Sequence, residues 1–274
     1  MRVVLWRRQR LLAQVSGSGP PVILVHNAGA DHRVWEPVAA TLARHYTVWL
    51  PDLPGFGRSD KPRTRYDLDT FADALGAVVD AAGPRVGLVG LCVGGAAAWR
   101  FTERSPERVA ALGVVHPATW NTLSAGPIVR LHNTLHRPER RALALRFLER
   151  AWSLLRRPVV DRLTHTPLAP PRRRAVDEAL SAPHTLRVLA AILADLPSFA
   201  ALDSFTRTPE TPPAFVGWGA QGPLVPPAGL PGVVRQLEPI SVLDLPHSGH
   251  LAPLEQPETL SEGLMRFLHH AEWR

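Results

Sequence analysis

Residues 86–95 read Val-Gly-Leu-Val-Gly-Leu-Cys-Val-Gly-Gly. The apolar run over residues 86–91 predicts a buried strand, and residues 96–103 predict a helix. A G-x-C-x-G turn lies between them, and its glycines, Gly90 and Gly94, leave room for a chain that reverses sharply. Cys92 would lie at the tip of this turn and at a helix N-terminus, where the helix dipole lowers a thiol pKa. A buried core cysteine is the alternative, but the strand, turn and helix together favour a nucleophile elbow.

The pattern outside this stretch alternates between short apolar segments and helical spacing. Strands are expected at residues 2–6, 11–16, 22–26, 47–50, 109–115, 214–218 and 241–245, and helices at 35–44, 68–82 and 260–270. Such alternation predicts an α/β fold with a parallel sheet and helices on both faces. Between about 118 and 208 the character is only helical or irregular. We therefore expect one domain over residues 1–274, with a core of about 1–117 and 209–274 and a helical lid of about 118–208.

Composition bounds the class of protein. The chain has 274 residues, 45% hydrophobic and 20% charged, which is ordinary for a globular domain. No stretch approaches the roughly 20 apolar residues of a membrane span, and the basic start is not followed by a long apolar run, so a cytoplasmic protein is expected. The single cysteine excludes an intrachain disulfide and a cysteine-based metal site. The twelve histidines are scattered without carboxylates at ligand spacing, so we expect no metal and no cofactor.

Positive charge is concentrated in the expected lid. The net charge is +7, and residues 130–174 hold twelve arginines against three acidic residues. A basic patch attracts polyanions, although an overall bias towards arginine, alanine and proline explains it equally well. Leucine, phenylalanine and tryptophan recur between these arginines at helical spacing. This favours an amphipathic lid helix with its apolar side towards a pocket over a nucleic-acid surface; a solvated helix face is the remaining alternative.

Four further stretches share the spacing of one family. They are His-Asn-Ala-Gly at 26–29, Pro-Asp-Leu-Pro-Gly-Phe-Gly-Arg-Ser-Asp at 51–60, Trp-Gly at 218–219, and His-Ser-Gly-His-Leu-Ala-Pro-Leu-Glu-Gln-Pro-Glu at 247–258. With the elbow, they resemble the α/β-hydrolase superfamily, in members with a helical lid after the sixth strand. The resemblance covers nearly the whole chain outside the lid. It implies an eight-stranded, mostly parallel sheet with helices on both faces.

The resemblance also implies roles for individual residues. Cys92 stands at the position of the nucleophile, which is usually serine, and His250 at that of the general base; His247 is its nearest competitor. A thiol and an imidazole within hydrogen-bond reach give either an ion pair or a base that deprotonates the thiol during attack. The oxyanion hole would be the backbone N–H groups of Ala28 and Val93.

The third member of the family's triad is where the chain departs from the pattern. The acid normally follows the Trp-Gly pair by three residues, and that position is Gly222. Some relatives place the acid after the sixth strand, which is His116 here. We therefore expect a Cys92–His250 dyad without a conventional acid, since a thiol depends less than a hydroxyl on a strong base. Asn27 replaces a family glycine, and asparagine tolerates left-handed backbone. The side chains that could line the pocket or assist are His26, Asn27, Asp31, His116, Trp120 and His247.

Three functions remain open. The first is acyl transfer, cyclisation or thioester hydrolysis through Cys92, as in cysteine members of the superfamily that act in polyketide-type secondary metabolism. The second is hydrolysis of a small ester or lactone by the same dyad. The third is a non-covalent member of the fold, a binding protein or a pocket-templated cyclase or lyase, with the triad retired. The expected partners are a small acyl substrate and, given the basic lid, an acyl carrier protein or coenzyme A thioester, and no nucleic acid.

Overall fold

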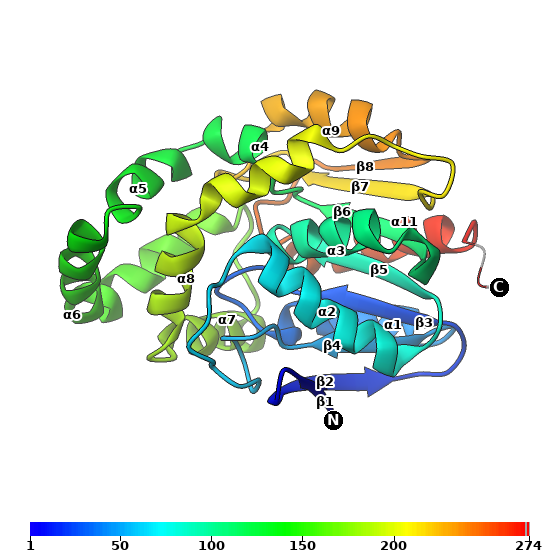
Figure 1. Ribbon diagram of the computed structural model, residues 1–274, viewed down its shortest axis with the longest axis horizontal. Coiled ribbons are helices and arrows are strands. Elements are labelled where there is room, and N and C mark those ends of the chain that lie inside the picture. The colour runs from blue at the N-terminus through cyan, green and yellow to red at the C-terminus, as the bar shows by residue number, and fades with distance from the viewer. Residues whose placement is uncertain (272, 274) are drawn as a thin grey trace.

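The computed structural model describes residues 1–271 and 273 and contains one eight-stranded sheet (Figure 1). The strand order is β1-β2-β4-β3-β5-β6-β7-β8. The pairs β1–β2 and β2–β4 are antiparallel, and every other neighbouring pair is parallel. The strands are β1 (Arg2–Trp6), β2 (Gln9–Ser16), β3 (Pro21–Val25), β4 (Thr47–Pro51), β5 (Val86–Leu91), β6 (Val109–Val115), β7 (Ala214–Gly219) and β8 (Ser241–Leu245). The expected mostly parallel, eight-stranded sheet is confirmed.

Helices cover both faces of the sheet. On one face α2 (Leu68–Ala82) packs against α3 (Val93–Arg104), and on the other α1 (Glu36–Leu42) packs against α11 (Pro257–Leu268). Helix α2 begins at its expected residue because the Asp67 side chain accepts a hydrogen bond from the Thr70 N–H. It ends at Ala82, and Gly83 caps it before a proline. Its apolar side chains, including Phe71 and Leu75, are buried between α3 and the sheet.

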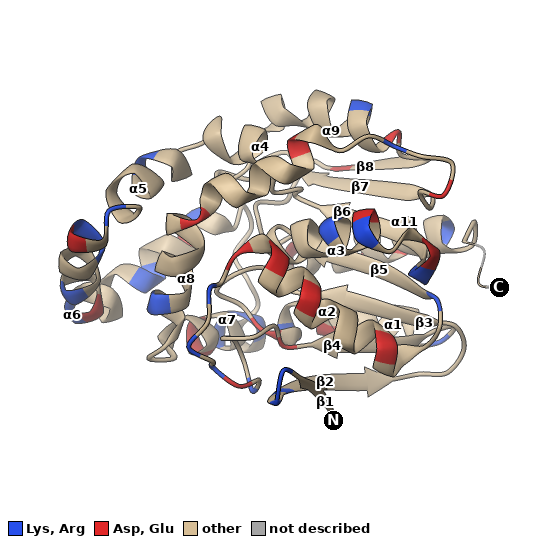
Figure 2. Ribbon diagram, viewed as in Figure 1, with Lys and Arg blue, Asp and Glu red and all other residues tan. Residues whose placement is uncertain are grey.

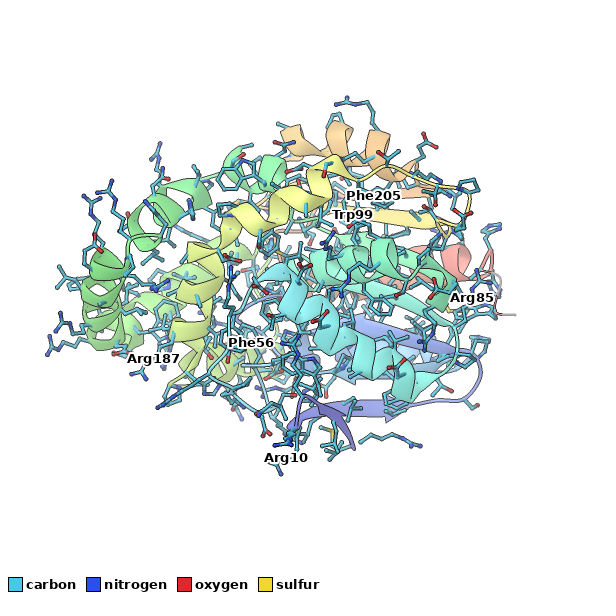
Figure 3. All side chains as sticks on the ribbon, in the orientation of Figure 1. Arg10, Phe56, Arg85, Trp99, Arg187 and Phe205 are labelled. Atoms are coloured by element: carbon cyan, nitrogen blue, oxygen red, sulfur yellow. The ribbon has the colours of Figure 1, made fainter. Side chains whose placement is uncertain are left out.

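A helical insertion separates β6 from β7 and lies to one side of the sheet (Figure 1). It contains α4 (Trp120–Ser124), α5 (Ile128–Leu135), α6 (Pro138–Leu163), α7 (Pro170–Ser181), α8 (Thr185–Ala194) and the 3-10 segment η3 (Leu196–Ser204). The ring of Phe205, just after η3, packs edge-to-face on Trp99 of α3 at 5.4 Å (Figure 3). This contact fixes the end of the insertion to the core. No helix in the described part of the chain could cross a bilayer by itself; α8 and η3 meet the length and hydropathy requirements only as a pair bent by 53°.

Helix α6 differs from the expected amphipathic lid helix. One apolar series, which includes Trp152, faces inward, and the Trp152 ring N–H donates to the Leu180 carbonyl of α7. The other series, Leu143, Phe147 and Leu154, is 65%, 68% and 78% exposed. The expectation that the apolar side of α6 faces the pocket is therefore wrong for this second series. Basic residues also lie along α6 in Figure 2, so this helix presents both apolar and cationic side chains to solvent.

Two local features were not expected from the pattern. Helix α9 (Leu230–Leu237) follows β7, where the sequence analysis predicted no helix. The expected helix over residues 35–44 begins earlier, as the 3-10 segment η1 (His32–Trp35), and its α-helical part ends at Leu42. The Asp31 carboxylate caps η1 by accepting from the Arg33 N–H, which is a local interaction that hydrophobic spacing does not report.

Candidate active site

Cys92 occupies the turn between β5 and α3 with strained backbone dihedrals. Its φ is 51° and its ψ is −113°, in a region that residues other than glycine rarely adopt. The backbone segments on either side of Cys92 lie close together: a Cβ on Gly90 would lie 2.3 Å from the Gly94 carbonyl carbon. A Cβ on Gly94 would lie 2.4 Å from the carbonyl oxygen of His26. The glycines of the motif are therefore required by close backbone approach, as the sequence predicted.

The thiol of Cys92 is in a low-dielectric environment. The residue is 7% exposed. Burial raises the pKa of the thiol to about 12, and a hydrogen bond with the Val93 N–H lowers it in part. The expectation that the helix N-terminus lowers this pKa is wrong here, because desolvation of the thiolate outweighs the backbone contribution. The thiol of Cys92 is therefore neutral at pH 7.

The loop after β3 carries the second expected oxyanion donor. Ala28 is half-buried, and its backbone N–H donates no hydrogen bond within the described residues. The left-handed position of this loop is Gly29, with φ of 82°, and Asn27 is not among the residues with positive φ. The expected reason for an asparagine at 27 is therefore wrong: its amide donates to the Ala28 carbonyl, and its Oδ1 is buried without a partner in the described structure.

His26 fixes this loop to the one after β4. Its Nδ1 is 2.7 Å from the Asn27 carbonyl oxygen, and its Nε2 is 2.9 Å from the Leu53 N–H. These partners assign the proton to Nδ1, since a carbonyl only accepts and an N–H only donates. Burial lowers the pKa of His26, so the ring stays neutral. His26 is a structural connector of two loops.

His250 lies in the loop after β8 and is 1% exposed, whereas His247 is exposed. The His247 backbone N–H donates to the Gln256 side chain. The His250 backbone N–H donates to the Leu163 carbonyl at the end of α6, at 2.6 Å. Of the two histidines, only His250 is buried among the loops at the carboxyl ends of the strands.

A carboxylate that the sequence analysis did not single out organises the histidine loop. Glu255 accepts hydrogen bonds from the backbone N–H groups of Gly249 and Leu251, which flank His250. It also accepts from the N–H groups of His165 and Thr166, in the connection between α6 and α7. Glu255 thus ties the histidine loop to the insertion. The sequence offered one signal for this role: Glu255 lies four residues after Leu251 in the stretch 247–258, and so is close enough to accept from that backbone N–H.

Gly222 supplies no acid, and the imidazole of His116 lies beside it. His116 follows β6 with φ of 49°, and its Nε2 lies 2.9 Å from the Gly249 carbonyl oxygen. The His116 and His250 ring centroids are 5.0 Å apart, with the planes at 42°. Nδ1 of each ring is buried without a hydrogen-bond partner among the described residues. No described carboxylate therefore meets His250.

Both imidazoles are neutral at pH 7. Burial lowers the pKa of His116 to about 4. The pKa of His250 is held well below its usual range by burial and by the charge that His116 would carry. Within the described residues no hydrogen bond joins the Cys92 thiol to His250. Of the two alternatives for the pair, a resting thiolate–imidazolium ion pair does not fit these neutral groups.

The other two predicted pocket residues are engaged elsewhere. The Asp31 carboxylate binds the guanidinium of Arg33, which also pairs with Glu178 of α7. Trp120 is half-buried and packs edge-to-face on His132 at 5.8 Å. Asp31, His32 and Asp52 lie close enough together to hold a cation. Their carboxylates already accept hydrogen bonds from Arg33, from His32 and from the Arg58 N–H, which accounts for the cluster without an ion.

Residues 20–257 match the family model described as "alpha/beta hydrolase fold". The chain belongs to the α/β-hydrolase fold family. An uncharacterised protein of Mycobacterium tuberculosis (strain ATCC 25618 / H37Rv) is 34% identical over 214 residues, 76% of this chain and 56% of that one. The dihydrolipoyllysine-residue acetyltransferase component of the acetoin cleaving system of Pseudomonas putida is 28% identical over 253 residues, 91% of this chain and 64% of that one. This α/β-hydrolase chain therefore spans less than two thirds of these relatives' length.

A solved structure shares the whole fold. The haloalkane dehalogenase of Agrobacterium tumefaciens C58 superposes with a TM-score of 0.83 over 98% of this chain and 95% of its own, at 23% identity. Identity this low shows the fold alone. The site chemistry of the α/β-hydrolase chain must therefore be argued from its own residues.

Proposed function

We propose that this protein transfers or hydrolyses acyl groups from thioesters or activated esters through a covalent acyl–Cys92 intermediate, with His250 as the base. One observation carries the proposal. Cys92 is held in a strained turn at the start of α3, with φ of 51°, beside the Val93 N–H. Strain of this kind persists only where the surrounding structure enforces it, and it is concentrated at functional sites.

The proposed reaction is balanced by two proton transfers. The thiol proton passes to Nε2 of His250 as the sulfur bonds to the acyl carbonyl carbon, and the carbonyl π electrons move to oxygen. The N–H groups of Ala28 and Val93 donate to this oxyanion, an interaction that supplies a few kcal/mol of stabilisation. His250 then returns the proton to the leaving alcohol or thiol. Water or a second acceptor releases the acyl group by the same steps, and Cys92 recovers its proton.

The nucleophile argues for a thioester or an activated ester as the substrate. The acyl–enzyme is itself a thioester, so exchange with another thiol is close to isoenergetic, and amines or alcohols compete with water for the acyl group. The acetyltransferase named among the relatives is consistent with this chemistry. However, the chain spans only 64% of that relative, so its activity does not carry over by similarity. Transfer and hydrolysis are both readouts of the proposal.

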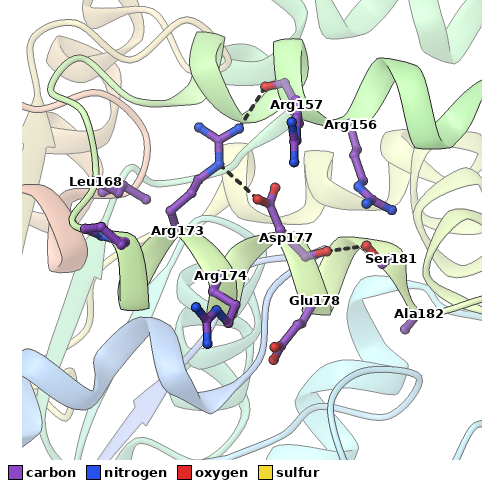
Figure 4. Close-up of a pocket in the computed structure, with 10 residues that line it drawn as sticks. Arg156, Arg157, Leu168, Arg173, Arg174, Asp177, Glu178, Ser181 and Ala182 are labelled. Carbon is purple, nitrogen blue, oxygen red and sulfur yellow. Dashed lines mark hydrogen bonds and ion pairs between the residues drawn. The ribbon is translucent and has the colours of Figure 1, made fainter.

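The anionic end of such a substrate has a candidate position between α6 and α7. A cavity of about 740 Å³ there is lined by several arginines, among them Arg156, Arg157 and Arg174 (Figure 4). The fourth arginine, Arg173, is paired with Asp177 at 3.2 Å. Guanidinium groups bind phosphate oxygens, and this supports the cavity as the proposed position for the phosphates of coenzyme A or of a carrier's phosphopantetheine. Helix α7 also covers the oxyanion loop, since Leu180 lies against Gly29.

One observation favours a second candidate function. Cys92 and His250 are both neutral and buried, and no hydrogen bond joins them within the described residues. A fold member that binds its ligand without covalent chemistry needs no activated thiol. In that case Cys92 only lines the binding site, and Cys92→Ala leaves the activity intact.

Mass spectrometry of the intact protein tests the proposal. After incubation with acetyl coenzyme A, p-nitrophenyl acetate or a small lactone, we expect an acetyl or ring-opened acyl adduct that is absent in Cys92→Ala. Cys92→Ser is the stricter variant, because a serine without a supporting acid should turn over at least about 100-fold more slowly. Full activity of Cys92→Ala would overturn covalent catalysis. For the cavity, Arg174→Ala should raise KM for acetyl coenzyme A but not for p-nitrophenyl acetate, with exposed Arg266→Ala as the matched control.

A further inference from the structure

We infer that His116 is a positioning residue for His250: its Nδ1 accepts a hydrogen bond from the Nδ1–H of His250 when His250 takes the thiol proton. This inference rests on the proposed covalent function of Cys92. It assigns to a neutral imidazole the role that a carboxylate plays in most triads, so that the Cys92 thiol donates to His250 and His250 donates to His116.

The tautomer of His116 supports this role. Its Nε2 faces the carbonyl oxygen of Gly249 at 2.9 Å, and a carbonyl oxygen only accepts, so Nε2 carries the proton. In the neutral ring Nδ1 is therefore a lone pair. The pKa of His116 of about 4 keeps that lone pair free throughout the neutral range. The same hydrogen bond ties the acceptor to Gly249, the residue next to His250.

Both nitrogen atoms of the proposed contact lack other partners. Nδ1 of His116 and Nδ1 of His250 are buried without hydrogen bonds among the described residues. Buried polar atoms without partners are uncommon and costly, and these two belong to rings whose centroids are 5.0 Å apart. The proposed contact would give both atoms a partner at once. A Cβ at position 222 would lie 3.3 Å from Nδ1 of His116. Because residue 222 is glycine, no side chain there stands between Nδ1 of His116 and a partner.

The described residues around His250 offer it no stronger acceptor. The nearest carboxylate of its loop, that of Glu255, is occupied by the N–H groups of Gly249 and Leu251. The ring of Trp218 also lies near His116, with the centroids 5.9 Å apart, and its Nε1 is buried without a partner in the described structure. Trp218 is a donor only, so it competes with His250 for His116 but cannot serve His250. A neutral acceptor stabilises an imidazolium less than a carboxylate does, which suits a thiol nucleophile.

The chain's single cysteine provides the test. The rate of Cys92 alkylation by iodoacetamide, followed against pH, reports the activation of the thiol independently of any substrate. We compare His116→Phe, which has no polar atom, with His116→Asp, which accepts but cannot donate to Gly249. We expect His116→Phe to slow alkylation and kcat at least about 10-fold with KM unchanged. His116→Asp should restore both and move the acid limb of the pH profile upward, because a carboxylate raises the pKa of His250.

Several outcomes separate the possibilities. If His116→Asp is folded and as slow as His116→Phe, His116 acts only by holding Gly249, and the inference is overturned. Trp218→Phe should leave alkylation unchanged; faster alkylation in this variant would show that Trp218 occupies Nδ1 of His116 in the wild type, and would overturn the inference. If Cys92 in the wild-type protein forms no acyl adduct, the proposed function fails separately. Should both His116 variants unfold, ¹⁵N NMR of the wild-type histidines still decides, because an Nε2–H tautomer for His250 rules out the contact.

Discussion

The imidazole of His116 fills the space that a side chain at position 222 would need: a Cβ on residue 222 would lie 2.8 Å from Cε1 of His116. The loss of the family's acid and the imidazole after β6 are therefore not independent. A carboxylate cannot be restored at 222 while His116 keeps its place, because any side chain there begins inside the contact distance of the ring. The two positions have to be changed together.

The first prediction follows from this relationship. Gly222→Ala should lower the free energy of unfolding by about 1–3 kcal/mol in the wild-type background, as overpacking does. In a His116→Ala background the same change should cost less than about 0.5 kcal/mol. Urea denaturation of the four proteins measures the coupling. Gly232→Ala, with nothing within 4 Å of its added Cβ, is the control; equal costs in both backgrounds would contradict the shared space.

The second prediction concerns pH. The pKa of His116 is lowered from 6.5 to about 4 in the folded protein. Between these values the unfolded chain binds a proton that the folded one does not, so stability falls as pH falls below about 6.5. At 1.36 kcal/mol per unit, this residue accounts for a loss of about 3 kcal/mol by pH 4. Urea denaturation between about pH 7 and pH 5 should give a steeper loss for the wild type than for His116→Phe.

Other histidines also change the free energy of unfolding with pH in that experiment. The pKa values of His26 and His250 are also lowered by burial, so they add to the acid loss in both proteins. The pKa of His32 is raised by the Asp52 carboxylate against the opposing effect of burial. Its stabilisation is present below about pH 6.5 and is lost as pH rises through its folded value. Parallel slopes for the wild type and His116→Phe would show that His116 is protonated alike in both states.

The third prediction concerns Glu255. Glu255→Gln replaces one acceptor oxygen by a donor that faces the N–H groups of Gly249 and Leu251. We expect a loss of about 1–3 kcal/mol in the free energy of unfolding, with kcat falling more than KM changes, because the loop that holds His250 is released. Glu258→Gln, exposed three residues on, is the matched control. Unchanged hydrogen-exchange protection at Gly249 and Leu251 would contradict this role.

The fourth prediction concerns the elbow. Gly94→Ala places a Cβ 2.4 Å from the His26 carbonyl oxygen and 2.6 Å from that of Val25. Because both atoms are backbone, the strand or the helix must move, and we expect a loss of more than about 2 kcal/mol in the free energy of unfolding. Thermal unfolding by circular dichroism measures it. Gly232→Ala in α9, which lacks such neighbours, should be neutral or stabilising.

The predictable part of the fold was the part with a strong period and short-range signals. The strands at 109–115 and 241–245 and the helix at 68–82 have the expected bounds. Their signals, which are buried apolar runs and glycine or proline breakers, lie within or next to each segment in the sequence. Helix α9 and the segment η1 were missed because neither is marked by a long apolar period. The orientation of α6 was half wrong, because two apolar series share that helix and sequence does not say which face meets the core.

The candidate site was predictable as a set of positions but not as an environment. The turn of Cys92 and the loop of His250 were marked by motifs. The raised pKa of the thiol follows from burial by segments distant in the chain, which no local pattern reports. The partner of Asp31 could not be foreseen either, since Arg33 is held by Glu178 of the insertion as well. The role of Glu255 depends on His165 and Thr166, about ninety positions upstream.

The hydrogen bonds that join the end of α6 to the histidine loop limit how this architecture can be recombined. The His250 N–H donates to the Leu163 carbonyl, and the Glu255 carboxylate accepts from the N–H groups of His165 and Thr166. A chimera that exchanges the whole insertion for that of a relative would remove these acceptors and donors from the loop that holds His250. Grafts that end before residue 163, and keep residues 163–166 with the parent scaffold, should retain the geometry of His250, whereas grafts that replace them should not.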